Sequence, residues 1–128
     1  MKAVAVGVLV AVVFGSQLHA QTVALNRVMR QKLIDAQSVL GAVVTTNWRE
    51  LERGSRALVK ATEEPAWQVL ASPEYVKQSE AFVRAANDLL DAATRRDQEA
   101  APLAYVALTM RCVQCHRYVA RARIAAAK

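Results

Sequence analysis

Apolar residues recur at steps of three and four along most of the chain, and the two-residue alternation of a half-buried strand is absent. Such steps place side chains on one face of a helix, so the sequence predicts helices throughout. The first helix is predicted over residues 23–44, where apolar positions follow steps of four, three, four and three. We expect its inner face to carry these residues: Met29, Leu33, Ala36, Leu40 and Val43.

Capping residues predict the starts of two further helices. Asn47 is expected to cap the second helix, with Glu50 three positions later as its partner in a capping box. Ser72 is expected to cap a third helix that begins at Pro73, because proline fits the first helical position, and that ends near Arg95. Their inner faces are predicted to carry Leu51, Ser55, Leu58 and Thr62 in the second helix, and Tyr75, Ser79, Phe82, Ala86, Leu89 and Ala93 in the third.

The fourth helix is predicted from about Gln98 to about Ile124. Pro102 falls in its first turn, where the missing N–H of proline removes no hydrogen bond. Residues 63–72, which include Trp67, are expected to connect the second and third helices. Four amphipathic helices with short connections favour an all-α fold, an antiparallel four-helix bundle.

The first twenty residues are predicted to be a secretory signal. Lys2 supplies a positive start, and residues 3–14 form an unbroken apolar run that is too short to span a bilayer. Ala20 offers a small residue before a cleavage at Gln21. Cleavage would leave residues 21–128 as one domain that is not embedded in a membrane. An uncleaved membrane anchor is the alternative.

The chemistry of the chain is concentrated in one pentapeptide, Cys112-Val113-Gln114-Cys115-His116. Its Cys-x-x-Cys-His spacing is that of c-type haem attachment. The two thiols share one side of the predicted helix and could add to the two vinyl groups of a porphyrin. The adjacent imidazole could reach the iron. The chain has two Cys and two His, so the pentapeptide holds both thiols and one of the imidazoles.

Three other uses of a Cys-x-x-Cys pair fit the sequence less well. A thioredoxin-like redox pair follows a strand in a βαβ unit, whereas the residues on both sides of Cys112 are predicted to be helical. A structural zinc site needs four protein ligands, and no second cluster in the sequence completes one. A disulfide across two intervening residues would close a very small loop and constrain the unfolded chain little.

Removal of the signal would also remove His19 and leave His116 as the single imidazole. A second iron ligand would then be Met, Lys, a terminus or water, or there would be none. Met29 is favoured because it lies on the predicted inner face and a thioether is a good ligand for haem iron; the alternative is a Met that fills the core. Met110 is on the same helix as His116 and would approach from the wrong side. Lys32 is expected to be solvated.

With these features the chain resembles the class II c-type cytochromes, the cytochrome c′ family and its low-spin relatives. The resemblance covers nearly all of residues 21–128. It rests on the four helices, on the pentapeptide in the last of them, and on segment 27–30 of the first, which reads Arg-Val-Met-Arg. It implies a haem inside the bundle, held by thioethers to Cys112 and Cys115, with His116 on the iron.

The same resemblance implies two alternatives for the other face of the iron. Met29 would match the low-spin electron carriers, whereas Leu33 would match the high-spin members, whose five-coordinate iron binds nitric oxide or carbon monoxide. The chain departs from the family four residues after the ligand His, where Ala120 replaces a common Arg, for which Arg121 or Arg123 could substitute. Many proteins of this kind pair through their first two helices, so a homodimer is an open expectation.

The sequence therefore predicts a periplasmic c-type cytochrome with one covalently bound haem c, which exchanges electrons with a redox partner protein. Export fits this prediction, because haem of this kind is attached outside the cytoplasm, where thiols must be kept reduced. A gas-binding protein for nitric oxide or carbon monoxide is the alternative. An enzyme such as a peroxidase is not expected, because it needs a distal acid–base group and the mature chain has no second His.

The charge of the chain agrees with a protein partner. The formal net charge is +6, which falls by one when Lys2 leaves with the signal. A modest basic surface suits docking to an acidic partner. No Lys/Arg-rich run with interleaved aromatic residues points to nucleic acid. The closest candidate, residues 117–123, is expected to meet haem propionates or solvent.

Overall fold

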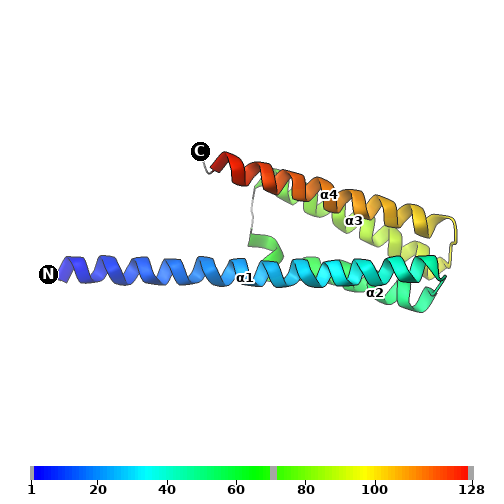
Figure 1. Cartoon of the computed structure of the whole chain (residues 1–128), viewed down its shortest axis with the longest axis horizontal. Helices are drawn as coiled ribbons and strands as arrows, with labels where there is room; N and C mark the ends of the chain where they lie inside the picture. Colours follow the sequence, from blue (N-terminus) through cyan, green and yellow to red (C-terminus); the bar gives the residue numbers. More distant parts are fainter. Residues whose placement is uncertain (1, 70–71, 127–128) are drawn as a thin grey trace.

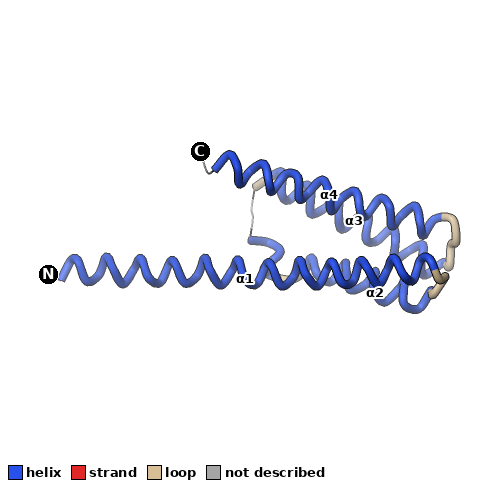
Figure 2. Tube along the Cα trace, in the orientation of Figure 1, coloured by secondary structure: helices blue, strands red, loops and turns tan. Residues whose placement is uncertain are grey.

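The computed structural model describes the backbone of residues 2–69 and 72–126, and the side chains of residues 20–68, 72–122 and 125. This part of the chain is helical and contains no strand, as the sequence predicts (Figures 1 and 2). It forms four α-helices and two short 3-10 helices: α1 (Lys2–Val44), α2 (Trp48–Lys60), η1 (Ala61–Glu63), η2 (Pro65–Val69), α3 (Pro73–Arg95) and α4 (Ala100–Ala126).

Consecutive helices pack against each other. α1 packs on α2, α2 on α3, and α3 on α4 along much of their lengths. The turn between α1 and α2 and the turn between α3 and α4 lie at the same end of the molecule, and α1 extends well beyond the other helices toward the N-terminus (Figure 1). α1 and α4 touch over a much shorter stretch than the other neighbours. The seam between α1 and α4 is therefore the least closed side of the molecule.

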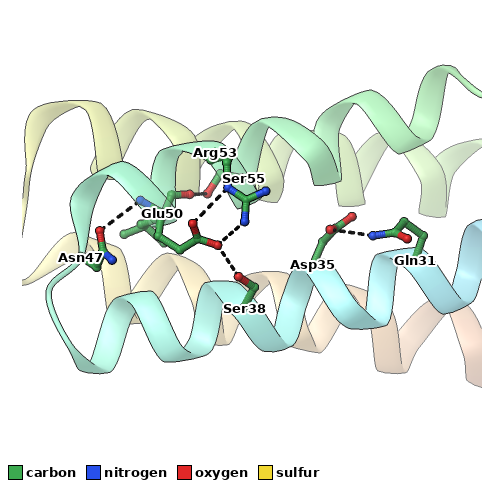
Figure 3. A network of polar contacts seen from close by, with 8 residues as sticks. Gln31, Asp35, Ser38, Asn47, Glu50, Arg53 and Ser55 are labelled. Atoms are coloured by element: carbon green, nitrogen blue, oxygen red, sulfur yellow. Dashed lines mark hydrogen bonds and ion pairs between the residues drawn. The ribbon is translucent and has the colours of Figure 1, made fainter.

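The start of α2 differs from a complete capping box. The Asn47 side chain accepts a hydrogen bond from the backbone N–H of Glu50 at 3.2 Å, as predicted. The Glu50 carboxylate does not return to Asn47, whose N–H donates to the Ala42 carbonyl instead. The Glu50 carboxylate instead accepts a hydrogen bond from the Ser38 hydroxyl of α1 at 2.6 Å and forms an ion pair with Arg53 (Figure 3). Glu50 therefore links α2 to α1.

The other helix ends are set by local hydrogen bonds. The Ser72 hydroxyl accepts from the backbone N–H of Tyr75 at 3.3 Å, which confirms the predicted cap. α3 ends at Arg95, also as predicted, because Arg96 adopts the left-handed conformation with φ 54°. α4 begins at Ala100, two residues later than expected, since the Asp97 carboxylate accepts from the Ala100 N–H at 2.9 Å.

The predicted inner faces of α2 and α3 are buried. Leu51, Ser55 and Leu58 of α2 are at most 1% exposed. In α3 the buried set is Tyr75, Phe82, Ala86, Leu89 and Ala93, together with Ala85 and Ala92. Thr62 and Ser79, the remaining predicted members, are half-buried.

Trp67 is part of the core although it lies in the predicted connection. Its side chain is 4% exposed and its ring centroid is 5.6 Å from that of Phe82. The Tyr75 hydroxyl donates a 2.6 Å hydrogen bond to the Trp67 carbonyl. The connection is therefore held against α3 by an aromatic contact and a buried hydrogen bond.

The predicted inner stripe of α1 is confirmed in part. Met29, Ala36 and Val43 are half-buried and pack against the core, but the most buried positions are displaced by one residue. Leu33 and Leu40, which were expected inside, are 59% and 44% exposed. The buried positions of α1 are Val28, Lys32, Val39 and Ala42. The rotation has a steric reason: α2 approaches α1 at Gly54, where an added Cβ would lie 2.6 Å from Cγ2 of Val39. Only a glycine allows this approach, which turns Val39 toward α2 and leaves its neighbour Leu40 outside.

Among the described residues, no helix combines the length and the apolar character that crossing a membrane requires. The side chains of residues 1–19, which carry nearly all of the predicted signal, lie outside the described part of the chain.

Gly54→Ala tests the close approach of α1 and α2. Val39 is fully buried and, as a β-branched residue in a helix, has little rotamer freedom with which to avoid the new methyl group. We expect overpacking to outweigh the helix propensity that alanine gains over glycine, so that the free energy of unfolding falls by about 1 kcal/mol. Urea unfolding followed by circular dichroism measures this change.

Gly41→Ala is the matched control, because a Cβ at this exposed position of α1 would meet nothing within 4 Å. We expect it to raise the free energy of unfolding by up to about 1 kcal/mol through helix propensity alone. Equal stabilisation by both substitutions would contradict the contact between Gly54 and Val39.

Glu50→Gln tests the link between α1 and α2 through pH. Hydrogen bonds from Arg53 and Ser38 lower the pKa of Glu50 from 4.5 to about 2. A lowered pKa stabilises the folded protein above pH 4.5, and this stabilisation is lost as the pH falls toward 2. We expect the substitution to flatten the fall of the urea midpoint over this range. Glu52→Gln, which removes the exposed pair with Arg56, should leave the fall intact.

Candidate functional site

α4 carries the Cys-x-x-Cys-His pentapeptide on the side that faces the other helices. Cys115 is 8% exposed and Cys112 is half-buried, one turn after the buried Leu108. His116 is exposed at the edge of this stripe. The helical spacing explains the difference, because residues three and four apart share a face while the adjacent residue is turned by about 100°. Both thiols therefore point inward and the imidazole lies at the rim.

The two thiols are unbonded to each other. Burial raises the pKa of both, and the nearby positive charge of Lys32 works against that rise. A buried, protonated thiol is protected from oxidation and from metals, since the thiolate is the reactive form. The pair is thus held as two free S–H groups on one wall of a cavity.

The cavity lies between α1 and α4 and has a volume of about 110 Å³. Cys112, Cys115 and His116 line its α4 side, and Met29 and Lys32 line its α1 side. The remaining wall residues are mostly apolar and come from all four α-helices and from η2: Leu33, Ala36, Leu58, Trp67, Phe82, Tyr105, Leu108, Thr109 and Arg111. The structure therefore brings all five predicted site residues to one cavity.

The two residues predicted for the distal face occupy different places. Met29 is half-buried and packs against the core. Leu33 also lines the cavity but is 59% exposed, so much of its side chain lies in solvent. Met110, which was not favoured as a ligand, is 48% exposed and does not line the cavity.

Lys32 is the residue that sequence reasoning missed. It was expected to be solvated, but it is only 8% exposed, and its Nζ lies 3.7 Å from the ring centroid of Trp67 and 3.5 Å from that of Phe82. The expectation is wrong because Lys32 lies four residues after Val28 and seven before Val39, on the buried face. That heptad spacing was the available signal, and the charge of the residue concealed it.

The environment of Lys32 disfavours its charged form. Burial lowers the pKa of its ammonium from 10.5 to about 8, and the nearby thiols of Cys112 and Cys115 oppose part of this fall. Among the residues with described side chains, no carboxylate forms an ion pair with it. The faces of two aromatic rings also stabilise its charge.

Several arginines lie on α4 at or near the residues that line the cavity. Arg111 is half-buried, lines the cavity and donates a 2.9 Å hydrogen bond to the Gln114 side chain. Arg117 and Arg121 are exposed on the next turns of α4. The side chain of Arg123 lies outside the described part of the chain. Guanidinium groups bind carboxylates well, so this part of α4 suits carboxylate groups of a ligand or of a partner.

The donor set fits a covalently attached haem. Two free thiols and an imidazole come from one helix, and a thioether and an amine come from the facing helix. No three His, Cys, Asp or Glu side chains gather into a metal site within the described part of the chain. A haem site does not need such a cluster, because the porphyrin nitrogens hold the iron and the protein adds axial ligands.

The cavity is too small to hold a haem unless the surrounding helices move apart. A pocket of about 110 Å³ is smaller than the ~300 Å³ at which pockets for drug-sized ligands begin. The cavity lies along the seam between α1 and α4, which pack on each other over a shorter stretch than the other neighbouring α-helices do. A planar ligand could enter by separating these two helices without disturbing the packing of α2 on α3.

Comparison with protein-family models, with curated proteins and with solved structures finds no match to this chain.

Lys32→Met tests the burial of the ammonium in haem-free protein. The folded state disfavours the charge, so at pH 7 we expect the variant to be more stable than the wild type by about 3 kcal/mol. Because a lowered lysine pKa makes the unfolded state bind more protons, this advantage should shrink as the pH rises from 8 to 10.5. Urea unfolding at a series of pH values gives the difference between the two proteins.

The thiols also titrate in both proteins, and loss of the Lys32 charge raises their pKa further in the variant. This second effect shrinks the advantage of the variant in the same direction as the pH rises. Lys60→Met, at an exposed position of α2, is the matched control and should show no such trend. A constant difference between Lys32→Met and the wild type across this range would contradict the burial of Lys32.

Proposed function

We propose that this protein is an exported monohaem c-type cytochrome that carries electrons. In this proposal residues 1–20 are a cleaved signal, residues 21–128 act in the periplasm as an antiparallel four-helix bundle, and one haem c is attached to α4. Cys112 and Cys115 provide the two covalent bonds, and His116 provides one axial ligand.

The observation that supports the proposal most strongly is the shared cavity. The pentapeptide could have been spread over the surface of α4, but both of its thiols face an apolar cavity that α1 closes from the other side. The opposite wall carries the thioether of Met29 and the amine of Lys32. A cavity with tethering thiols on one wall and metal-binding donors on both walls suits an iron porphyrin.

Attachment needs no chemistry beyond what the thiols supply. Each S–H adds across one vinyl C=C bond, so that sulfur bonds to one carbon and the proton goes to the other. No group leaves and no oxidant is consumed. The thiols must be reduced for this addition, and both are free in the structure.

Electron transfer is favoured by the two walls. When bound, the haem supplies the one-electron ferric–ferrous couple. His116 and a donor on α1 would hold the iron from both sides, so its surroundings change little when its charge changes. His116 is exposed, with Arg117 next to it, so an acidic redox partner could dock close to the iron.

Gas binding is the weaker alternative on this structure. It requires an open coordination position, and in the sequence hypothesis Leu33 would have guarded it. Leu33 lies mainly in solvent, whereas two donor side chains line the same wall. These positions favour six-coordinate iron over the five-coordinate iron that would bind nitric oxide or carbon monoxide.

The test is production of the whole chain with an export and cytochrome-maturation apparatus. We expect a coloured protein whose denatured mass exceeds the processed polypeptide by one haem, with a low-spin spectrum in both oxidation states. Cys112→Ala and Cys115→Ala should each lose one of the two covalent bonds. Colourless protein at the mass of the bare polypeptide would refute the proposal. High-spin iron that binds carbon monoxide readily would refute the electron carrier and support the gas-binding alternative.

A further inference from the structure

Lys32 occupies a position that packing alone does not explain. Lysine is almost never fully buried without a partner, yet this residue is 8% exposed, its ammonium lies against the rings of Trp67 and Phe82, and no carboxylate with a described side chain pairs with it. An apolar residue of similar length would fill the space without the penalty of a buried charge. The amine therefore calls for a functional explanation.

Resting on the haem attachment proposed above, we propose that Nζ of Lys32 is the second axial ligand of the iron, on the face opposite His116.

The position of Lys32 in the cavity supports this assignment. Lys32 projects from α1 into the cavity whose facing wall carries Cys112, Cys115 and His116. Its charge interacts with both thiols, so the amine lies near the points at which the porphyrin would be fixed. His116 would approach the iron from α4, and a ligand for the other face must come from a different helix. Lys32 meets that condition.

Lys32 is more deeply buried than Met29, the other candidate ligand on α1. Both residues line the cavity from α1, one turn apart. Lys32 belongs to the buried stripe that also contains Val28 and Val39, whereas Met29 lies at the edge of that stripe and is only half-buried. The rotation of α1 that turned Leu33 outward therefore also turned Lys32, and not Met29, toward the centre.

The surroundings of the Lys32 amine also favour its coordination to iron. Coordination requires the neutral form, in which Nζ has a free lone pair. The ammonium gives one proton to solvent and the nitrogen then bonds to iron, so charge and atoms balance. An apolar cavity without a carboxylate favours this loss of a proton. Iron would then replace the aromatic faces as the partner of the amine.

Lysine ligation would change the properties of the protein in a definite direction. A thioether raises the reduction potential of haem iron, and an amine, which favours ferric iron more strongly, would hold the potential lower. A bound amine would also close the iron to carbon monoxide. Exchange of Lys32 for a residue without a donor should therefore raise the potential and open the iron.

A direct test uses the purified haem protein with its own sequence. Lysine labelled with nitrogen-15 is incorporated, and pulsed electron paramagnetic resonance of the ferric protein measures the coupling of the iron to nitrogen. We expect a coupling to nitrogen-15 that is absent from unlabelled protein. This measurement does not depend on whether a variant folds.

Three variants then assign the coupling. We expect Lys32→Leu to lose the nitrogen-15 coupling and the low-spin spectrum, and to bind carbon monoxide. Met29→Leu should keep the coupling and the spectrum of the wild type. Lys60→Leu, at an exposed lysine of α2, should also keep them and controls for the loss of one lysine.

The outcomes separate this inference from the proposed function. Absence of covalent haem would overturn both. Haem-containing protein without a nitrogen-15 coupling would refute lysine ligation and leave the cytochrome assignment in place. This holds whether the iron is high-spin or has a low-spin spectrum that is lost in Met29→Leu. A coupling that survives in Lys32→Leu would place the ligand on another lysine and would also refute the inference.

Discussion

The close contact between α1 and α2 at Val39 and Gly54 fixes the rotation of α1, and the cavity depends on that rotation. Gly54 has no side chain, so Val39 packs directly against the backbone of α2. With Val39 fully buried, the heptad spacing brings Lys32 and Val28 to the same inner face. A rotation by one residue would exchange Lys32 for Leu33 and give the cavity an entirely apolar α1 wall.

The other three helices position the pentapeptide more simply. Phe82, Leu89 and Leu108 are at most 2% exposed and hold α4 against α3. Because Cys112 and Cys115 continue the stripe of Leu108 along α4, the same packing that buries Leu108 turns both thiols inward. The α1–α4 seam is the least tightly packed, so the stable part of the fold supports the thiols while the side that would receive a ligand can open.

The aromatic contacts of Lys32 connect the core to the proposed site. Trp67 and Phe82 form one wall of the cavity and at the same time anchor the connection between α2 and α3. Their ring faces are among the few apolar surfaces that can accept a cation. They would hold the amine in the cavity before a metal is present, and this keeps a donor in place at low conformational cost.

Much of the architecture follows from local sequence features, which act over a few residues. Asn47, Ser72 and Pro73 mark helix starts because their hydrogen bonds or missing N–H groups fit only there, and the spacing of the pentapeptide places both thiols on one side of a helix. The inner face of α1 could not be read in this way. Its apolar positions allow two stripes one residue apart, and the choice between them lies in Gly54, twenty-one residues from Leu33. The burial of Lys32 likewise depends on rings contributed by η2 and α3, which only the folded chain brings beside it.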